Sequence, residues 1–309
     1  YQTLFLRAYY PLEYLVAVLN NGGGFYRSEF YVHEARMMGA TIHAPCINKS
    51  FAVNCIYGTD IYLGYMYLKE LESRVMERIL KERQLHGVFT SLEDFLDRVP
   101  ISIEQLSILI RINAFRFTKI NKHKLLWEAH LFLSKGTIVD HPKLFPPTHQ
   151  KFKIPRLHTT DLEMAFTQLE LLGFCLCSPF HLLKEPPKNT NGSRDLERYL
   201  NRNIDIYGYL VTVKNTNTHN GKRMHFATCV DQHGEVFDTV LFPPVAAKYY
   251  FRGRGIYRFY GKVVSEFGFL SIETIKMQKQ EVIQDPRYAD MKTASKRLLT
   301  TQKNKDSTI

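Results

Sequence analysis

The hydrophobic positions along the chain follow two different periods, and the period changes near residue 200. Before this point apolar residues recur every three or four positions, as they do on one face of an α-helix. After Arg202 they alternate with polar residues, as in strands that bury one face. The pattern predicts a helical N-terminal part followed by a β-rich part.

In the first part, residues 1–20 predict a helix with a kink at Pro11. The sequence Asn20-Asn-Gly-Gly-Gly24 breaks this helix, because these residues tolerate a positive φ. A second helix is expected from about Ser28 to Met38, with Gly39 as its left-handed end residue.

Further helices are marked by a hydroxyl residue followed three positions later by an acid or an amide, the pattern of a capping box. This pattern occurs at Thr90-Ser-Leu-Glu93, Ser102-Ile-Glu-Gln105 and Thr160-Asp-Leu-Glu163. It predicts short helices between residues 61 and 115 and one helix that ends near Gly173. Short paired helices can present backbone amides to phosphate, or they can simply form a small core; the pattern alone leaves both open.

In the second part, five alternating runs occur within about 70 residues, with a helix expected over Pro244–Tyr250 between the third run and the fourth. The runs are Ile204–Val213, Met224–Val230, Val236–Leu241, Ile256–Val264 and Phe269–Ile275. Five strands with one helix are typical of the oligonucleotide-binding barrel (OB-fold), whereas an immunoglobulin-like sandwich needs about seven strands. The sequence therefore predicts a five-stranded OB-fold barrel.

The charge of the chain favours a polyanionic partner. The 41 Lys and Arg residues exceed the 30 Asp and Glu residues, which gives a formal charge of +11 and a pI near 9.3. Nucleic acid is the first candidate and an anionic membrane the second. No apolar run approaches the roughly 20 residues of a membrane-spanning helix, and the first residues do not form a signal peptide, so we expect no membrane partner.

The cysteines predict a cytoplasmic protein without a metal site. They are five in number, which is odd, and none forms a CxxC pair: Cys46, Cys55, Cys175, Cys177 and Cys229. We expect them to be reduced core residues. The chain also starts without Met inside an expected helix, so we expect it to be a piece of a longer protein.

The candidate chemistry is binding chemistry. Cations surround the first turn of the predicted barrel, where they could contact phosphates, and three ring-bearing residues nearby could stack on bases. These six candidates for single-stranded DNA binding are Lys214, Lys222, Arg223, His225, Phe237 and Tyr257. A purely structural barrel is the alternative.

We expect no catalytic residue and no cofactor in this chain. No Asp-x-Asp lies on a strand pattern, Gly22-Gly-Gly24 lacks the rest of a phosphate-binding loop, and the twelve His residues show no metal-ligand spacing.

The order of these parts resembles the C-terminal portion of the alpha subunit of bacterial DNA polymerase III. The resemblance covers most of residues 1–275, and the stretches that carry it are Tyr1–Glu13, Glu34–Gly39, Ala44–Ser50, Tyr62–Gly64, Ser91–Phe95, Leu109–Phe115, Glu170–Phe174 and Gly221–Pro243. It implies a multidomain protein, α then β, whose catalytic palm and metal-binding N-terminal (PHP) domains lie upstream and are absent here.

The resemblance implies five segments. They are the end of the fingers domain (1–60), a helix-hairpin-helix clamp-binding domain (61–135), a linker with a clamp motif and one helix (136–200), the OB-fold nucleic-acid-binding domain (201–276) and a basic tail (277–309).

It also implies roles for single residues. Arg27, Arg36 and Lys49 would contact nucleotide or template from the fingers, unless they are solvated helix-end charges. Lys69 and Arg111 would contact duplex DNA from the two hairpins, and His141, Leu144 and Phe145 would dock into the beta sliding clamp.

The sequence departs from the family pattern at both hairpins. Glu70 and Glu72 stand where the first hairpin usually has glycines, and Asn113 stands where the second has one. Because carboxylates repel phosphates, these residues put duplex binding by the first hairpin in question.

By resemblance, the parent protein is a DNA-directed DNA polymerase that uses deoxynucleoside triphosphates and Mg²⁺. Its implied partners are single-stranded and duplex DNA, the beta sliding clamp and other replisome subunits. The alternative from another class is a non-catalytic polymerase-derived scaffold that recruits the clamp or other polymerases to damaged DNA. A stand-alone RNA-binding barrel is a third hypothesis.

Overall fold

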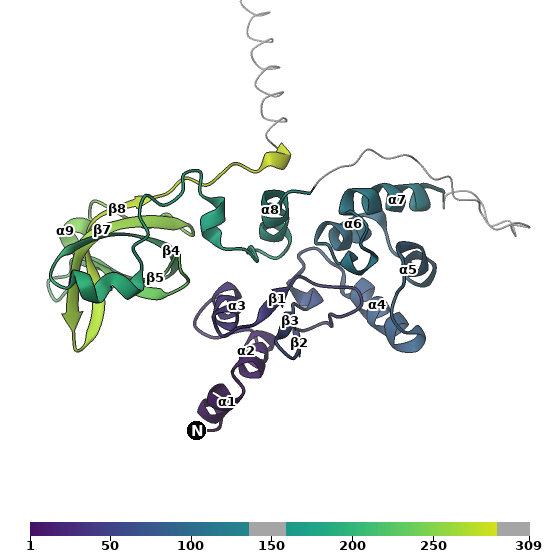
Figure 1. Ribbon diagram of the computed structural model, residues 1–309, viewed down its shortest axis with the longest axis horizontal. Coiled ribbons are helices and arrows are strands. Elements are labelled where there is room, and N and C mark those ends of the chain that lie inside the picture. Colours follow the sequence, from purple (N-terminus) through teal and green to yellow (C-terminus); the bar gives the residue numbers. More distant parts are fainter. Residues whose placement is uncertain (136–158, 289–309) are drawn as a thin grey trace, which may run out of the picture. The chain divides into compact units, whose positions relative to one another are not determined.

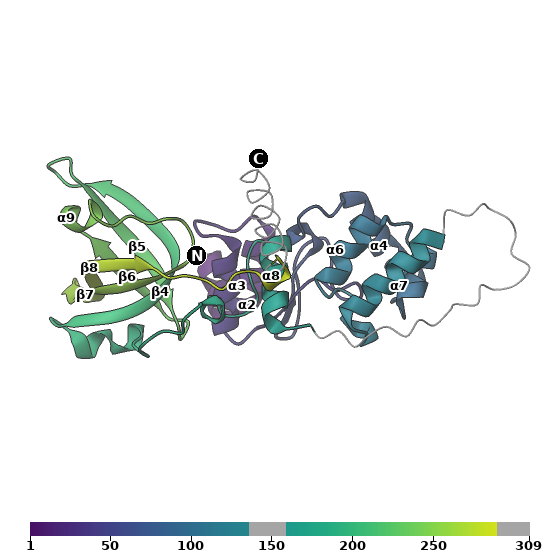
Figure 2. The same cartoon turned by 90° about the horizontal axis from the view of Figure 1, so that it is seen from above.

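The structure is a computed structural model that describes residues 1–135 and 159–288 (Figures 1 and 2). The chain divides into two compact units. One comprises Tyr1–Asn21 with Met38–Leu176, and the other comprises Gly22–Met37 with Cys177–Ile309. Residues 22–37, which the resemblance places at the end of the fingers, thus group with the barrel.

The first unit opens with α1 (Gln2–Tyr9) and α2 (Pro11–Asn20). Tyr10 separates them with φ −133° and ψ 60°, because the residue before proline is pushed out of the helical region. The kink expected at Pro11 is thus a break between two helices. Only α2 buries an apolar face, made of Leu15, Val16 and Leu19.

A small sheet follows, in the order β1 (Thr41–His43), β3 (Asp60–Tyr62), β2 (Cys55–Tyr57). β1 runs parallel to β3, and β2 runs antiparallel to it. The alternation of hydrophobic and polar positions predicts no strand in this region. Strands of three residues are too short to display an alternation, which is why β2 and β3 were missed.

Figure 1 shows the remaining helices of this unit. They are α4 (Ser73–His86), α5 (Leu92–Arg98), α6 (Ile103–Arg111), α7 (Lys122–Lys135) and α8 (Asp161–Leu171), with short 3₁₀ turns at Tyr65–Tyr67 and Arg116–Thr118. The Phe95 ring lies 5.1 Å from the Phe89 ring and 5.0 Å from the Phe115 ring, which ties α5 to the turn after α6.

Two of the three capping boxes begin a helix where the sequence placed them. The hydroxyls of Ser102 and Thr160 accept from backbone amides three residues later, at the starts of α6 and α8. The third is displaced by one residue: Ser91, not Thr90, caps α5 and accepts from Asp94 N, while Thr90 N donates to the Asp94 carboxylate. The expected end of α8 is confirmed, since Gly173 has φ +88°.

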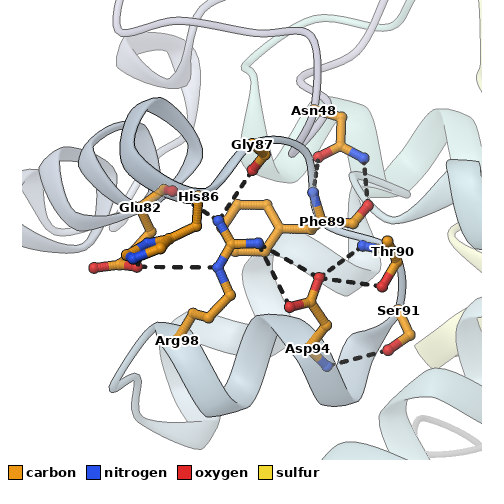
Figure 3. A network of polar contacts seen from close by, with 9 residues as sticks. All are labelled: Asn48, Glu82, His86, Gly87, Phe89, Thr90, Ser91, Asp94 and Arg98. Atoms are coloured by element: carbon orange, nitrogen blue, oxygen red, sulfur yellow. Dashed lines mark hydrogen bonds and ion pairs between the residues drawn. The ribbon is translucent and has the colours of Figure 1, made fainter.

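Arg98 holds the corner between α4 and α5 (Figure 3). Its Nη2 donates to Glu82 O at 2.7 Å and to Gly87 O at 3.0 Å, and its guanidinium lies 4.0 Å from the centroid of the Phe89 ring. Asn48 exchanges two hydrogen bonds with the Phe89 backbone. The corner is thus fixed by side chains that bind the backbone of α4 and of the segment that follows it.

The second unit contains a closed barrel of five strands in the order β4-β5-β6-β8-β7 (Figure 2). The strands are β4 (Asn203–Asn217), β5 (Arg223–Asp231), β6 (Val236–Leu241), β7 (Ile256–Glu266) and β8 (Phe269–Lys279). Neighbours pair antiparallel except β6 and β8, whose parallel pairing joins Asp238 to Ser271. The expected class, a helical part followed by a five-stranded OB-fold barrel, is confirmed.

The barrel interior is tightly filled and mainly apolar, with Thr239 and Thr274 as buried polar residues. Phe237 and Phe259 occupy its centre with Ile206, Cys229 and Ile272. Glycine is required at Gly208 on β4, because a Cβ there would lie 2.6 Å from Phe237 Cζ. The helix between β6 and β7, α9 (Pro243–Ala246), is shorter than the expected Pro244–Tyr250.

In the same unit, α3 (Ser28–Met37) packs against the barrel. Tyr209 Oη donates to Glu29 Oε1 at 2.7 Å, and His33 Nε2 lies 2.9 Å from Gly234 O. Burial and the Glu29 carboxylate raise the pKa of Tyr209, so its hydroxyl stays a donor. Polar groups on both sides therefore hold this helix to β4 and to the β5–β6 turn.

Within residues 1–135 and 159–288, no helix combines the length and the apolar character needed to cross a membrane. All five cysteines are free thiols, and Cys46, Cys175 and Cys229 are buried.

Candidate nucleic-acid interface

A groove of about 1160 Å³ lies at one end of the barrel. One wall is the β4–β5 hairpin, and the other is the segment that contains α9. The lining residues are Val213, Asn215, Thr218, Asn220, Lys222, Arg223, His225, Pro243, Pro244, Ala246, Ala247, Tyr250 and Phe251. This groove, called the barrel groove below, brings together Lys222, Arg223 and His225 of the six barrel residues predicted to bind single-stranded DNA.

The long register of β4 with β5 builds the first wall. Asn215 pairs with His225 and Asn217 pairs with Arg223, so the hairpin extends to the turn at residues 218–222. Gly221 closes this turn with φ +71°, and Thr218 N donates to Lys222 O at 2.8 Å. The turn places the two cations at the mouth of the groove.

The electrostatics of the barrel groove favour an anion. Lys222 and Arg223 are exposed, and none of the described residues that line the groove is acidic. The opposite wall offers the exposed Tyr250 ring, over which the Arg252 guanidinium lies at 5.0 Å from the ring centroid. Cations beside an aromatic wall form the arrangement that binds a single strand through its phosphates and bases.

His225 forms part of the wall and offers no surface for stacking. It is 6% exposed, its Nδ1 lies 2.6 Å from Asn215 Oδ1, and its ring meets the Phe251 ring edge to face. Burial lowers the pKa of His225, and the nearby Arg223 charge lowers it further. Its role as a base-stacking residue therefore needs correction.

Phe237 and Tyr257 also need correction, because both rings lie inside the barrel at 3% and 1% exposure. Tyr257 Oη donates to Gly253 O and accepts from Arg252 N, which fixes the segment before β7. Neither ring has a free face for a base.

Lys214 lies on the opposite face of the hairpin from the groove. It pairs with Phe226, and adjacent residues of a strand point to opposite faces. Both side chains are exposed. The exposed rings of Phe226, Tyr250, Phe267 and Phe269 are candidates that the sequence did not single out. Alternation with inward residues on the same strand could have indicated Phe226 and Phe269, whereas Tyr250 and Phe267 lie outside the strands.

The three fingers residues differ in their surroundings. Arg27 Nη2 donates to Leu210 O at 3.0 Å and to Val211 O at 3.3 Å, so its guanidinium binds β4. Arg36 is half-buried in the last turn of α3. Lys49 is exposed, and its ammonium lies 5.3 Å from the centroid of the Tyr57 ring.

At the first hairpin, internal groups bind the backbone. Lys69 N donates to Leu171 O at 2.9 Å, and Glu72 N donates to Gln105 Oε1 at 2.8 Å. Gln105 Nε2 in turn donates to Glu70 O. Glu70 has φ 65°, the conformation that glycine adopts without strain. The hairpin therefore keeps a glycine-type backbone with a carboxylate side chain on it.

At the second hairpin, Arg111 forms an ion pair with Glu170 of α8 at 2.5 Å. Asn113 has φ 64°, again at a glycine position. The backbone N–H of Asn113 donates to Ile110 O, and the backbone N–H of Ala114 donates to Leu109 O, both at 2.9 Å. Both cations predicted to contact duplex DNA thus belong to hairpins whose polar groups largely bind within the unit.

The clamp candidates His141, Leu144 and Phe145 lie outside the described residues, as does the tail beyond residue 288. Among the residues that are described, no group of three or more His, Cys, Asp or Glu side chains could hold a metal ion.

Parts of the chain are similar to known proteins. Residues 39–125 match the family model of the helix-hairpin-helix motif. The chain is 28% identical to the error-prone DNA polymerase of Mycobacterium tuberculosis (strain ATCC 25618 / H37Rv) over 177 residues, which are 56% of this chain and 16% of that protein. It is 28% identical to the DNA polymerase III subunit alpha of Treponema pallidum over 269 residues, which are 79% of this chain and 22% of that protein.

Among solved structures, the chain resembles a mitochondrial single-stranded DNA binding protein from S. cerevisiae, with a TM-score of 0.22, 11% identity, and coverage of 26% of this chain and 93% of the other. The chain spans about a fifth of the length of the curated relatives it matches. It is related to the DNA polymerase III alpha subunits and the error-prone DNA polymerases, as the resemblance in its sequence indicated.

Proposed function

We propose that this relative of the DNA polymerase III alpha subunits is a DNA-binding C-terminal part of such a polymerase, and that its barrel holds the single-stranded template. The observation that carries the proposal is the barrel groove, where Lys222 and Arg223 face an aromatic wall and no described lining residue is acidic. The relatives, which are named as DNA polymerases, support the choice of DNA.

Binding follows from two kinds of contact. The phosphates of the strand lie along Lys222 and Arg223 and release counterions, which makes binding depend on salt. The bases lie against Tyr250 and the prolines of α9, and each base stacked on an aromatic ring contributes about 1–3 kcal/mol. Neither contact reads base edges, so we expect little sequence preference.

The test is a salt titration of the binding of oligothymidylate to the full chain. In the slope of log affinity against log salt, each single-strand phosphate contact contributes about −0.7. Lys222→Ala with Arg223→Ala should therefore lower the magnitude of this slope by about 1.4. The matched control is Lys262→Ala with Lys276→Ala, which removes two exposed cations from β7 and β8. A groove variant whose slope equals that of the native chain removes the groove from the binding surface.

The same titration with duplex DNA and RNA of equal length separates the hypotheses. Preference for single-stranded DNA supports the template-holding role. Tighter binding of RNA favours a stand-alone RNA-binding barrel, and weak binding of all three favours a scaffold.

The parent protein is, on this proposal, a DNA-directed DNA polymerase that uses deoxynucleoside triphosphates and Mg²⁺. The described residues offer no carboxylate cluster for that ion. We therefore assign no catalytic step to them. This chain positions template and primer for a reaction whose catalytic residues lie elsewhere in the parent, and it works beside other replisome subunits.

Contact with the beta sliding clamp through His141, Leu144 and Phe145 is part of the proposal and rests on the sequence alone. Leu144→Ala with Phe145→Ala should abolish clamp binding in surface plasmon resonance, because paired apolar anchors act as hot spots. Pro142→Ala is the control within the same segment. Clamp binding by the double variant would place the docking site elsewhere.

The cations of the fingers and hairpins are not equally suited to bind nucleic acid. Lys49 is an exposed candidate for nucleotide or template, whereas Arg27 binds β4. Lys69 is the better candidate for duplex DNA, since its side chain is exposed and Arg111 is paired with Glu170.

One observation favours the second function, a non-catalytic scaffold that recruits the clamp or other polymerases to damaged DNA. The hairpins carry Glu70, Glu72 and Asn113 in place of glycines, and the backbone amides of Glu72 and Asn113 donate to Gln105 Oε1 and Ile110 O. A chain that no longer grips duplex DNA would tolerate these residues. Weak duplex binding together with intact clamp binding would support this function.

A further inference from the structure

A second cleft of about 370 Å³ adjoins the barrel groove. Three segments line it: Phe25-Tyr26-Arg27 before α3, residues 210–213 of β4, and Gly253-Arg254 before β7. The bonds from Arg27 Nη2 to the carbonyls of Leu210 and Val211 hold the first segment against β4. We call it the Phe25 cleft.

The Phe25 cleft and the barrel groove share a boundary. Val213 lines both, and the segment that supplies Tyr250 and Phe251 to the groove supplies Gly253 and Arg254 to the cleft. The two hollows therefore follow one another along β4. A ligand that is long and thin could occupy both at once.

The chemistry of the Phe25 cleft matches that of the groove. Phe25 is fully exposed, and a free ring of this kind is a platform on which a base can stack. Two arginines and no acidic residue are among the described residues that line the cleft. Glu29 Oε2 lies 3.9 Å from Arg254 Nη1, and the Glu29 side chain is only 14% exposed, so the arginine side chain, at 51%, presents the charge to solvent.

We propose that the Phe25 cleft is a second subsite for single-stranded DNA. The strand leaves the barrel groove past Val213 and enters the cleft, where Phe25 stacks on a base and Arg254 contacts a phosphate. This inference rests on the proposed function, because it extends the strand that Lys222 and Arg223 bind. The polyanion is chosen over a peptide because cations and a free ring, without an acid, line both hollows.

The test compares Phe25→Ala with Phe267→Ala in the full chain. Both rings are fully exposed, and Phe267 lies in the turn between β7 and β8, outside both hollows. Binding is measured by fluorescence anisotropy with oligothymidylates of about 4 to 16 nucleotides, the range of site sizes for such barrels.

We expect Phe25→Ala to weaken the longest oligonucleotides at least about fivefold, the loss that corresponds to one stacked base, and to leave the shortest unchanged. Phe267→Ala should change neither. Equal affinities of native chain and Phe25→Ala at every length would overturn the second subsite. Arg254→Gln provides an independent reading, since it should lower the salt slope for long oligonucleotides by about 0.7.

A failure of this inference can be told apart from a failure of the proposed function. If Lys222→Ala with Arg223→Ala weakens binding while Phe25→Ala does not, the strand occupies the groove alone. If the groove variant also binds normally, the proposed function itself fails. Photo-crosslinking with 5-iododeoxyuridine at successive positions gives a direct readout: we expect adducts on Phe25 or Tyr26 from one end of the strand and on Tyr250 from the other.

Discussion

The two hairpins of the first unit and the groove of the barrel carry similar cations, but they use their polar groups in opposite ways. At the hairpins, Arg111 pairs with Glu170 and the Lys69 amide binds the Leu171 carbonyl. At the groove, Lys222 and Arg223 are exposed in a hollow without a described acidic lining residue. α8 and Gln105 thus occupy at the hairpins the place that the proposed strand would take at the groove.

This difference shows that a count of cations does not locate a nucleic-acid site. A phosphate at a hairpin must replace hydrogen bonds that already exist, each with a net value of about 0.5–1.5 kcal/mol. A phosphate at the groove replaces only water and counterions. The neighbours of a cation therefore decide whether its charge is available.

The largest effect that we expect comes from Gln105→Ala, which removes the side chain that joins the first hairpin to α6. Gln105 is 8% exposed, and its loss leaves the Glu72 amide and the Glu70 carbonyl without this partner. The first unit should lose about 2–3 kcal/mol of unfolding free energy. The single tryptophan, Trp127 on α7, reports the urea transition of this unit by fluorescence.

The exposed Gln278 on β8 supplies the control, because Gln278→Ala should leave the Trp127 transition in place. A Gln105→Ala chain as stable as the control would mean that water replaces both hydrogen bonds. The first hairpin would then be as open to a ligand as the groove, and the two regions would no longer differ in this respect.

The next effect concerns backbone strain. An L-residue in the left-handed region costs about 1–2 kcal/mol, whereas glycine there costs about 0.5–1 kcal/mol through the entropy of the unfolded chain. Glu70→Gly should therefore stabilise the first unit by up to about 1 kcal/mol. Asn113→Gly should change little, because asparagine tolerates this conformation. The Trp127 urea midpoint measures both, and a larger gain for Asn113→Gly would contradict strain at Glu70.

The fold was largely predictable because its signals are local. Pro11 divides α1 from α2, Thr160 caps α8, and the change to a period of two near residue 200 marks the barrel. The strands β2 and β3 were not predictable, since each has three residues and is held by pairing with a distant segment.

The site was predicted only in part, because alternation shows which residues share a face but not which face is inside. On β5, His225 and Cys229 point into the barrel and Phe226 points out, the reverse of what size and polarity suggest. Beside Cys229 the interior is small, because the Phe237 ring fills it up to Gly208. The partners of Arg27 and Arg111 lie 183 and 59 residues away, and no local pattern announces them.

A smaller effect should follow from Glu170→Gln, which removes the charge that holds Arg111. If the freed guanidinium gains one phosphate contact, the salt slope for duplex DNA rises by about 0.9. Glu281→Gln, which releases Lys184 in the second unit, is the control. An unchanged slope would show that Arg111 does not reach DNA even when released, which would sharpen the contrast with the groove.

The smallest effect on stability is expected at His225, which lines the groove and is bound internally to Asn215. Burial lowers its pKa below 6.5, so the unfolded chain takes up a proton at a higher pH than the folded barrel does. His225 therefore costs stability as the pH falls through about 6.5, and the cost levels off below the folded pKa.

His225→Gln removes this dependence and keeps a hydrogen-bonding group near Asn215. The unfolding free energies of the native chain and of His225→Gln are measured by urea denaturation and circular dichroism. Between pH 7.5 and 5.5, we expect the native chain to lose less than about 1.4 kcal/mol of unfolding free energy relative to the variant. The Trp127 transition should not shift between the two chains, since it belongs to the other unit. If the difference in unfolding free energy between the two chains does not vary with pH, His225 titrates alike in the folded and unfolded chains, as an exposed residue does. His225 would then again be a candidate for stacking on a base.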